Sequence, residues 1–299
     1  MQFLSARVAN EEARIRFAFG YARDAWVQVE ERAGFALDTR FVPAAETAAA
    51  DRTCVYLLLR GRWVLHGVSD RAFEGPSGFI LTEEQLEGAN GLRSCTFRSE
   101  GAPLASIELH LPTAHVLAPR SVPTPLPIDE RAWSAASAVL AALDGESPAA
   151  LLSERIPLLL HELGRLAITT ANAPEAITRS IPPALARVLG AMARYVERMD
   201  LGGTLKDLET ATGTSQRQVA RDIESAVRML GLAGLSWRLA SRHLRIKIAV
   251  LLLSAGHATV AEVARMVGWG SADAMTRAFR NAGLAAPSIV QREVRGASS

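Results

Sequence analysis

Cysteine is scarce in this sequence, and long apolar runs are missing. Cys54 and Cys95 are its two cysteines, and neither belongs to a CxxC motif or lies at ligand spacing from a histidine. The sequence therefore predicts two reduced, half-buried thiols rather than a disulfide framework or a zinc finger. The apolar run Ile248–Leu253 is far shorter than the roughly 20 residues that a membrane-spanning helix needs. We expect no transmembrane segment.

A large net charge and a disorder-promoting composition are also missing. Hydrophobic residues make up 49% of the chain, charged residues make up 21%, and the formal net charge is only +2. These values are typical of a globular protein and exclude a disordered chain. Acidic residues stand near the N-terminus where a signal peptide has its apolar core, so no export signal and a cytoplasmic location are predicted. A length of 299 residues allows two domains with cores of their own.

The small net charge conceals an asymmetry between the two ends of the chain. Residues 185–299 contain 16 Lys and Arg against 9 Asp and Glu, a balance of +7, whereas residues 1–184 have a balance of −5. A basic segment joined to an acidic one is typical of a polyanion-binding module attached to a part that does not bind polyanions. The basic C-terminal part is therefore the first candidate for a nucleic-acid interface.

The N-terminal part has the pattern of short β-strands separated by glycine and proline turns. Ala25–Glu31 is the first expected strand. Residues 53–68 contain two apolar segments around Arg60-Gly61, which predicts a hairpin. Residues 91–112 predict a further pair of short strands, broken at Ser99–Pro103. At this density of turns we expect a small antiparallel barrel or sandwich.

Some polar and aromatic side chains of this part are candidates for a ligand site. The potential metal ligands are His66, Glu108, His110 and His115. Glu108 and His110 would share one face of a strand, but the sequence has no HxH pair and places no third ligand beside them. We therefore predict no metal and no other cofactor, and favour ordinary surface or pocket histidines. The candidates for a small-molecule site are Tyr56, Trp63 and His66, although buried aromatic residues more often belong to a core.

After the proline-rich segment 119–127 the pattern becomes helical. Apolar residues recur at spacings of three and four in residues 129–143 and 148–168, which predicts two helices. These helices either form a dimer surface or cover the open side of the barrel, and the sequence favours neither role. Small residues and proline in 169–180 indicate a linker. The predicted division is a first domain at 1–170, a linker at 171–183 and a second domain at 184–297.

The C-terminal part contains one helical pattern twice. In the first copy Thr204 caps a helix, Gly213 makes a turn and Ser215 caps a second helix, which is the pattern of a helix-turn-helix unit. In the second copy these places are taken by Thr259, Gly268 and Ser271. Equivalent positions are offset by 55 residues before the turn and by 56 after it. We infer an internal duplication of a DNA-reading unit.

A long helix is predicted between the two copies, in the segment SWRLASRHLRIKIAVLLLSAG that spans residues 236–256. Its first half carries a basic stripe of Arg238, Arg242 and Arg245, and Ile248–Leu253 is apolar on nearly every side. A helix over Trp237–Ser254 would be about 27 Å long. Because one turn of DNA is about 34 Å, such a helix would hold the two units roughly one turn apart.

Two helix-turn-helix units joined by a long helix resemble the AraC/XylS family of bacterial transcription regulators. The likeness covers residues 185–292, and its motifs are SWR, VAEVARMVGWGS and RAFRNAGLAAPS. It implies an α+β protein with an N-terminal cupin-like β-barrel, appended helices, and a C-terminal all-α domain in which a long helix joins two helix-turn-helix units. The N-terminal half resembles the family's effector and dimerisation domain mainly by its position and strand density.

The resemblance further implies that the second helix of each unit enters the major groove of double-stranded DNA, in two successive grooves. The expected DNA contacts are Gln216, Arg217, Gln218 and Arg221 in the first unit, and Thr276, Arg277 and Arg280 in the second. Ala272, Asp273 and Ala274 depart from the expected pattern, because they offer little to base edges and Asp273 repels phosphate. The first unit is therefore predicted to supply more of the sequence discrimination.

These observations predict a sequence-specific transcription regulator, not an enzyme, controlled by a small-molecule effector in the N-terminal domain. We expect a homodimer that binds double-stranded DNA, acts with RNA polymerase and makes no membrane contact. One alternative is a metal-dependent cupin-type enzyme with a C-terminal module that localises it on DNA. A second is a constitutive architectural protein without an effector. No nucleophile–base pair or metal triad in the sequence supports the enzyme.

Overall fold

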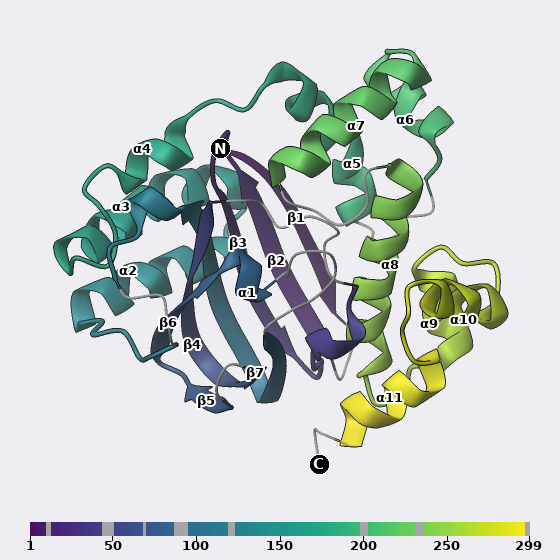
Figure 1. Cartoon of the computed structure of the whole chain (residues 1–299), viewed down its shortest axis with the longest axis horizontal. Helices are drawn as coiled ribbons and strands as arrows, with labels where there is room; N and C mark the ends of the chain where they lie inside the picture. The colour runs from purple at the N-terminus through teal and green to yellow at the C-terminus, as the bar shows by residue number, and fades with distance from the viewer. Residues whose placement is uncertain are drawn as a thin grey trace.

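The computed structural model describes residues 1–9, 13–43, 51–67, 70–86, 95–118, 123–197, 203–230 and 236–296. An antiparallel sheet forms the N-terminal part, and helices lie on both sides of it (Figure 1). The C-terminal part is entirely helical where it is described. The α+β class predicted from the sequence is confirmed.

The sheet has seven strands in the described part of the chain. They are β1 (Gln2–Ala9), β2 (Arg14–Tyr21), β3 (Trp26–Ala33), β4 (Arg52–Gly67), β5 (Arg71–Glu74), β6 (Ser77–Thr82) and β7 (Cys95–Pro112). All pairings are antiparallel in the order β1-β2-β3-β7-β4-β5, and β6 also pairs with β4. β7 therefore lies between β3 and β4 in the middle of the sheet, where alternate side chains reach both of its faces.

β4 and β7 are long continuous strands, so the prediction of two pairs of short strands is wrong. The residues expected to form a hairpin around Arg60-Gly61 form the single strand β4, and those expected to break at Ser99–Pro103 belong to β7. The two strands pair along their length with a register shift around Arg60. Gly61 has a φ of +90°, and a Cβ there would lie 3.1 Å from Leu104 Cα. A glycine at positive φ can stand at an irregularity within a continuous strand as well as in a turn, and Gly61 lies at the register shift between Arg60 and Arg62.

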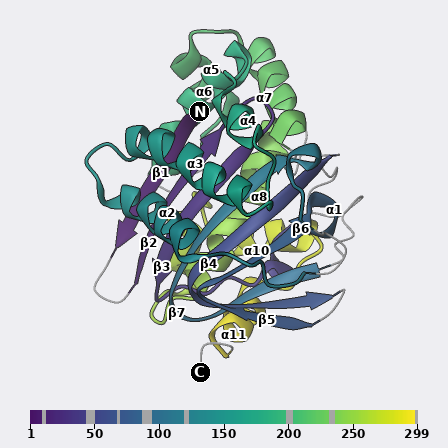
Figure 2. The same ribbon diagram turned by 90° about the vertical axis from the view of Figure 1, so that its left-hand side faces the viewer.

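Two helices cover one face of the sheet. They are α2 (Glu130–Ala141) and α3 (Pro148–Arg165), and both lie across the strands in Figure 2. Val27 and Val29 of β3 join one apolar cluster with Leu159 and Leu163 of α3, all of them fully buried. The two helices predicted for this region are confirmed, and in this structure they cover the sheet.

The segment predicted as a linker contains a short helix, α4 (Ala173–Thr178). Its Ala176 and Ile177 are buried in the same cluster as α2 and α3. Residues 171–183 therefore include part of the N-terminal core. The remaining short elements are α1 (Glu83–Leu86) and the 3₁₀ turns η1 (Thr39–Phe41), η2 (Thr113–His115) and η3 (Ala142–Asp144).

Seven helices follow in the described C-terminal part. They are α5 (Pro183–Glu197), α6 (Leu205–Thr212), α7 (Gln216–Leu230), α8 (Trp237–Leu253), α9 (Val260–Met266), α10 (Ala272–Asn281) and α11 (Pro287–Gly296). A bilayer crossing needs about 20 apolar residues in a row, and no described helix supplies them.

The sheet and the C-terminal helices share an apolar core. Ile15 and Phe17 of β2 belong to the same cluster as Val250 and Leu253 of α8. The backbone N of Ala36 also donates a hydrogen bond of 2.8 Å to Ser254 Oγ at the end of α8. In Figure 1, α8 runs beside β1 and β2 along this contact. The two parts of the chain are therefore packed together through α8.

Candidate nucleic-acid interface

The pair α6–α7 has the local geometry of a helix-turn-helix unit. Thr204 and Asp207 form a capping box, in which Thr204 N donates to Asp207 Oδ2 at 2.7 Å. Gly213 ends α6 with a φ of +66°, and Ser215 Oγ then accepts a hydrogen bond from Gln218 N at the start of α7. A residue with a side chain would be strained at the φ of Gly213. The glycine therefore permits the tight turn between the two helices.

The pair α9–α10 repeats this geometry. Thr259 and Glu262 form an equivalent capping box, in which Thr259 N donates to Glu262 Oε2 at 2.8 Å. The hydrogen bonds from the side chain and the backbone of Thr259 hold the pKa of Glu262 below its usual value. Gly268 has a φ of +83°, and Ser271 Oγ caps α10 by accepting from Ala274 N at 3.1 Å. Equivalent caps and an equivalent turn glycine are what an internal duplication predicts.

Both units bury the apolar residues that occupy equivalent positions in the two copies of the pattern. The pairs are Leu208 and Val263, Val219 and Met275, and Ile223 and Phe279, and each side chain is at most 2% exposed. The first unit packs with Trp237 at the start of α8, whereas the second packs with Leu253 at its end. α8 thus belongs to both cores. Its 17 residues make a rod of about 26 Å that fixes the two units relative to each other.

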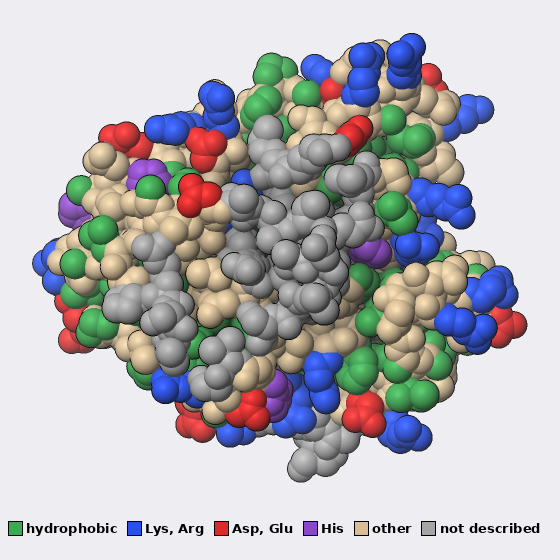
Figure 3. All heavy atoms as spheres, viewed as in Figure 1, with side chains coloured by type: hydrophobic (Ala, Val, Ile, Leu, Met, Phe, Trp, Pro, Cys, Tyr) green, Lys and Arg blue, Asp and Glu red, His purple; other side chains and the backbone are tan. Residues whose placement is uncertain are grey.

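Basic side chains line the edge of the molecule that these helices form. Figure 3 shows Lys and Arg side chains along the right-hand edge, from α6 and α7 at the top down to α10. The exposed basic residues of α6 to α10 are Lys206, Arg217, Arg221, Arg238, Lys247, Arg265, Arg277 and Arg280. A basic edge that includes the second helix of each unit is electrostatically suited to the phosphate backbone of DNA.

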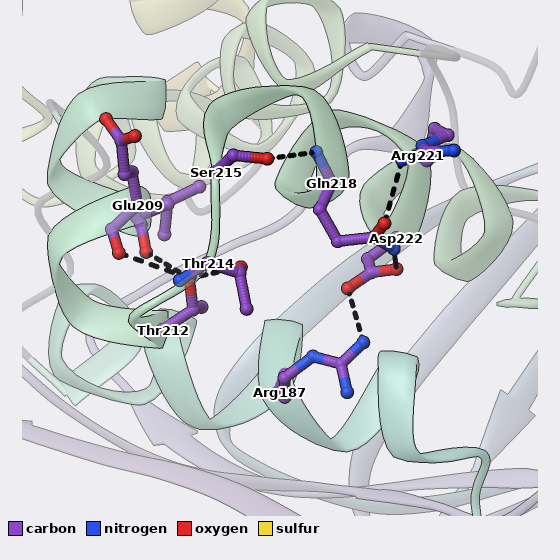
Figure 4. Close-up of polar contacts among 9 residues, drawn as sticks. Arg187, Glu209, Thr212, Thr214, Ser215, Gln218, Arg221 and Asp222 are labelled. Carbon is purple, nitrogen blue, oxygen red and sulfur yellow. Dashed lines mark hydrogen bonds and ion pairs between the residues drawn. The ribbon is translucent and has the colours of Figure 1, made fainter.

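Gln218 and Arg221 are held in a chain of hydrogen bonds that reaches α5 (Figure 4). Gln218 Oε1 accepts from Arg221 Nη2 at 2.9 Å, and Gln218 Nε2 donates to Asp222 Oδ1 at 2.6 Å. The other oxygen of Asp222, Oδ2, accepts from Arg187 Nη2 at 2.8 Å. Gln218 is half-buried and Asp222 is buried. The amide of Gln218 therefore orients Arg221 in this structure, and both of its polar atoms are engaged.

Gln216 and Arg217 occupy the first turn of α7, and both are exposed. Gln216 Nε2 donates to Glu209 Oε2 of α6 at 2.8 Å. Arg217 has no hydrogen bond or ion pair with any described residue. Its guanidinium donors are therefore free of intramolecular contacts within the described chain, and a guanidinium can bind the O6 and N7 atoms of guanine.

In the second unit, α10 carries exposed side chains of both charges. Thr276 Oγ1 donates to Ala272 O of its own helix at 2.9 Å. Arg277 and Arg280 are exposed and have no partner among the described residues. Asp273 is exposed in the first turn of α10, where its negative charge opposes an approaching phosphate.

Arg187 and Asp222 were missed by the sequence analysis. Part of the signal was present, because Gln218 and Asp222 are four residues apart and therefore adjacent on one helical face. Arg187 comes from α5, and only the packing of α5 against α7 brings it to Asp222. The sequence spacing could reveal the pair within α7 but not the tertiary ion pair.

Replacing Asp222 with alanine should lower the free energy of unfolding by about 1–3 kcal/mol, because the buried end of the hydrogen-bond chain loses its acceptor. It should also weaken DNA binding, since Arg221 loses its support through Gln218. Urea denaturation and a duplex-binding assay measure the two effects. Glu209→Gln, which alters an exposed contact on α6, is the matched control and should change stability by less than about 0.5 kcal/mol. Equal stability of the two variants would contradict a structural role for Asp222.

The three residues predicted to bind a small molecule do not come together. Tyr56 and Trp63 are buried, and the ring of each lies 5.2 Å from that of Phe97. His66 is partly exposed instead, with Nδ1 at 3.7 Å from Asp70 Oδ1. Tyr56 and Trp63 belong to a packed aromatic cluster, and His66 lies outside it.

Of the four candidate metal ligands, two lie together and two lie apart from them. His115 Nδ1 lies 3.0 Å from Thr170 Oγ1, and His66 is near the surface, so neither joins the others. Glu108 and His110 share one face of β7, as the sequence predicts. Cys54 of β4 lies directly opposite His110, and the ligand atoms of Cys54, Glu108 and His110 are within 4.8 Å of one another.

Comparison with known proteins gives structural but no sequence matches. Neither a protein-family model nor a curated protein matches the chain. ToxT from Vibrio cholerae is similar in structure, with 10% sequence identity and a TM-score of 0.37 over 89% of this chain and 98% of ToxT. ToxT from strain SCE256 with a bound unsaturated fatty acid has 12% identity and a TM-score of 0.35, over 98% of this chain and 99% of that one.

An AraC-like transcriptional activator, CuxR, is also similar, with 12% identity and a TM-score of 0.24 over 95% of this chain and 81% of CuxR. These similarities run along most of each chain. The sequence identities and the TM-scores are low in all three cases.

Proposed function

We propose that this chain is a sequence-specific, DNA-binding transcription regulator of the AraC type that places α7 and α10 in two successive major grooves. The observation that carries this proposal is the pair of equivalently capped units held by α8. The second helix of each unit presents exposed arginines at the same basic edge. Helices of helix-turn-helix units read DNA in this way, and paired units read sites about one helical turn apart.

In this proposal the first unit supplies most of the base discrimination. Arg217 projects from the first turn of α7 without an intramolecular partner among the described residues, and Arg221 is oriented by Gln218. Arg277 and Arg280 of α10 neutralise phosphates, while Gln216 and Thr276 make weaker polar contacts. Phosphate contacts position a protein on DNA, and contacts to base edges specify the sequence.

A fixed distance between the two units predicts a strict spacing of the two half-sites. Duplexes selected by the purified protein from a random pool should contain two half-sites about 10 bp apart. Inserting 5 bp between them rotates one half-site to the opposite side of the duplex, and binding should fall to the level of a single half-site. Inserting 10 bp returns both half-sites to the same side of the duplex but separates them by more than α8 can span. Binding should therefore fall to the level of a single half-site again. Unchanged affinity for both insertions would contradict the proposal.

We further propose that a small molecule controls this regulator. Support comes from a hollow of about 640 Å³ where the sheet meets the end of α8 and the start of α9. Its apolar lining includes Phe35 and Leu252, and its polar lining includes His257, Glu262 and Arg265. Its size suits a small organic ligand. A rise in melting temperature with one compound from a metabolite panel, and no rise with its inactive analogues, would support this control.

Homodimerisation and contact with RNA polymerase belong to the same proposal. The outer surface of α2 and α3 supports the first of these, because Leu158 of α3 is a large apolar side chain that is 58% exposed, whereas Leu159 and Leu160, which follow it, are buried. Sedimentation equilibrium of the full chain distinguishes a dimer from a monomer.

A further inference from the structure

Three side chains with different ligand atoms meet inside the sheet. Cys54 of β4 and His110 of β7 are direct partners in the antiparallel pairing, and Glu108 lies two residues before His110 on the same face. Their exposed fractions are 0%, 3% and 8%, respectively. The thiol, imidazole and carboxylate atoms all lie within 4.8 Å of one another. The group is thus enclosed in the protein and built on two neighbouring strands rather than on loops.

The carboxylate of Glu108 has only weak partners among the described residues. Gln28 Nε2 and His110 Nε2 approach it, and both contacts are 3.5 Å long. A second buried carboxylate, that of Glu30, accepts from Gln28 Nε2 at 3.2 Å, and Arg32 lies 3.7 Å from Glu30. Among these described side chains, the guanidinium of Arg32 is therefore the one positive charge beside the two carboxylates of Glu30 and Glu108. A buried carboxylate is costly without a close cation or strong hydrogen bonds, and a metal ion beside Glu108 would supply the missing charge.

Neighbouring side chains hold the ligands in place. The ring of Trp26 stacks on that of His110, with centroids 3.4 Å apart and planes 13° apart. Gln28 contacts Glu108 from the opposite strand, β3. Groups that orient metal ligands in this way raise the precision and the affinity of a site.

We propose that Cys54, Glu108 and His110 bind one divalent transition-metal ion of the zinc class. A thiolate, an imidazole and a carboxylate together suit Zn²⁺, whereas Mg²⁺ and Ca²⁺ require oxygen ligands. Zinc–ligand bonds of about 2.0–2.3 Å place tetrahedral ligand atoms about 3.5 Å apart. Contraction of the group by about 1 Å meets that requirement, and three protein ligands leave the fourth position open.

The sequence alone does not reveal this site. Cys54 is 54 residues before Glu108 in the chain, and no short motif joins it to the other two. The pairing of β4 with β7, including the register shift around Arg60, determines which residue lies opposite His110.

Titration of the metal-stripped full chain with Co²⁺ tests the proposal. A thiolate bound to Co²⁺ gives a charge-transfer band in the near ultraviolet, which should saturate at one Co²⁺ per chain and disappear when Zn²⁺ is added. Cys54→Ser should abolish the band, and Glu108→Gln and His110→Gln should each weaken Co²⁺ binding at least tenfold. Cys95→Ser is the matched control, because Cys95 is also buried but donates to Gln85 O at 2.9 Å and lies outside the group. It should keep the band.

The melting temperature gives a second measurement, and its wild-type value does not depend on how well the variants fold. Zn²⁺ should raise the melting temperature of the wild-type chain and of Cys95→Ser, and leave that of Cys54→Ser unchanged. A wild-type chain without the band, or a band that survives in Cys54→Ser and vanishes in Cys95→Ser, would overturn the proposal. An unchanged melting temperature of the wild-type chain on addition of Zn²⁺ would also overturn it. That result would indicate that Glu108 and His110 contact each other without a metal ion. None of these outcomes depends on DNA binding.

Discussion

Replacement of Phe279 with alanine should lower the free energy of unfolding by about 3–5 kcal/mol, because it leaves a large cavity in the core of the second helix-turn-helix unit. Phe279 is fully buried in a cluster with Met275, Val263 and Val290, and its ring lies 6.3 Å from that of Trp269. These side chains come from α9, α10, α11 and the turn between α9 and α10, so the cavity would loosen the packing that holds α10. Urea denaturation of the full chain measures the loss.

The same replacement should shorten the footprint of the protein on DNA. Protection from nuclease should persist over the half-site of the first unit and disappear over the other. Ile223→Ala, at the equivalent position of the first unit, should cost about 2–5 kcal/mol and produce the opposite footprint. Met266→Ala is the control, since that side chain is 51% exposed, and it should change stability by less than about 0.5 kcal/mol. Loss of both half-sites in Phe279→Ala would indicate that the units do not bind independently.

Arg217→Ala and Arg280→Ala should weaken DNA binding in two different ways. Loss of Arg217 removes a base contact, so the binding free energy for the preferred site should weaken by about 1–3 kcal/mol, while the affinity for unrelated DNA stays the same. Loss of Arg280 removes a phosphate contact, so affinity should fall for every sequence, and the slope of log affinity against log salt should decrease by about 1. Binding across a set of mutated sites, at several fixed salt concentrations, separates the two effects.

Arg23→Ala provides a control for the loss of one positive charge. Arg23 is exposed between β2 and β3, outside the C-terminal helices, and its replacement should leave both the affinity and the salt slope nearly unchanged. If Arg217→Ala reduces binding equally on all sites, then Arg217 contacts phosphate and the assignment of base reading to α7 is wrong.

The helical part of the fold was predictable because its signals are local. Thr204 and Thr259 cap helices, Gly213 and Gly268 make turns at positive φ, and the offset between the copies exposes the duplication. Each of these effects acts over a few residues, where spacing determines contact.

The sheet was less predictable because strand pairing acts over long separations. Gly61 indicates a turn by its identity, yet Arg60 and Arg62 on either side of it both pair with β7, so it lies at a register shift inside a strand. The residues expected at the DNA interface also have contacts with residues far away in the sequence, which the sequence pattern does not predict. The sequence predicts Gln218 at or near the exposed N-terminal face of its helix, but the ion pair of Asp222 with Arg187, which engages Gln218 indirectly, depends on tertiary packing.

The shared core between α8 and the first two strands bears on how this chain could be re-engineered. Phe17 and Phe35 lie in one cluster with Val250 and Leu253, so the C-terminal helical part presents an apolar surface that the sheet covers. A chimera that joins residues 184–297 to a foreign sensor module would leave that surface bare. Such a fusion would aggregate unless the new module carried a matching patch, and grafting should therefore exchange β1, β2 and α8 as one unit.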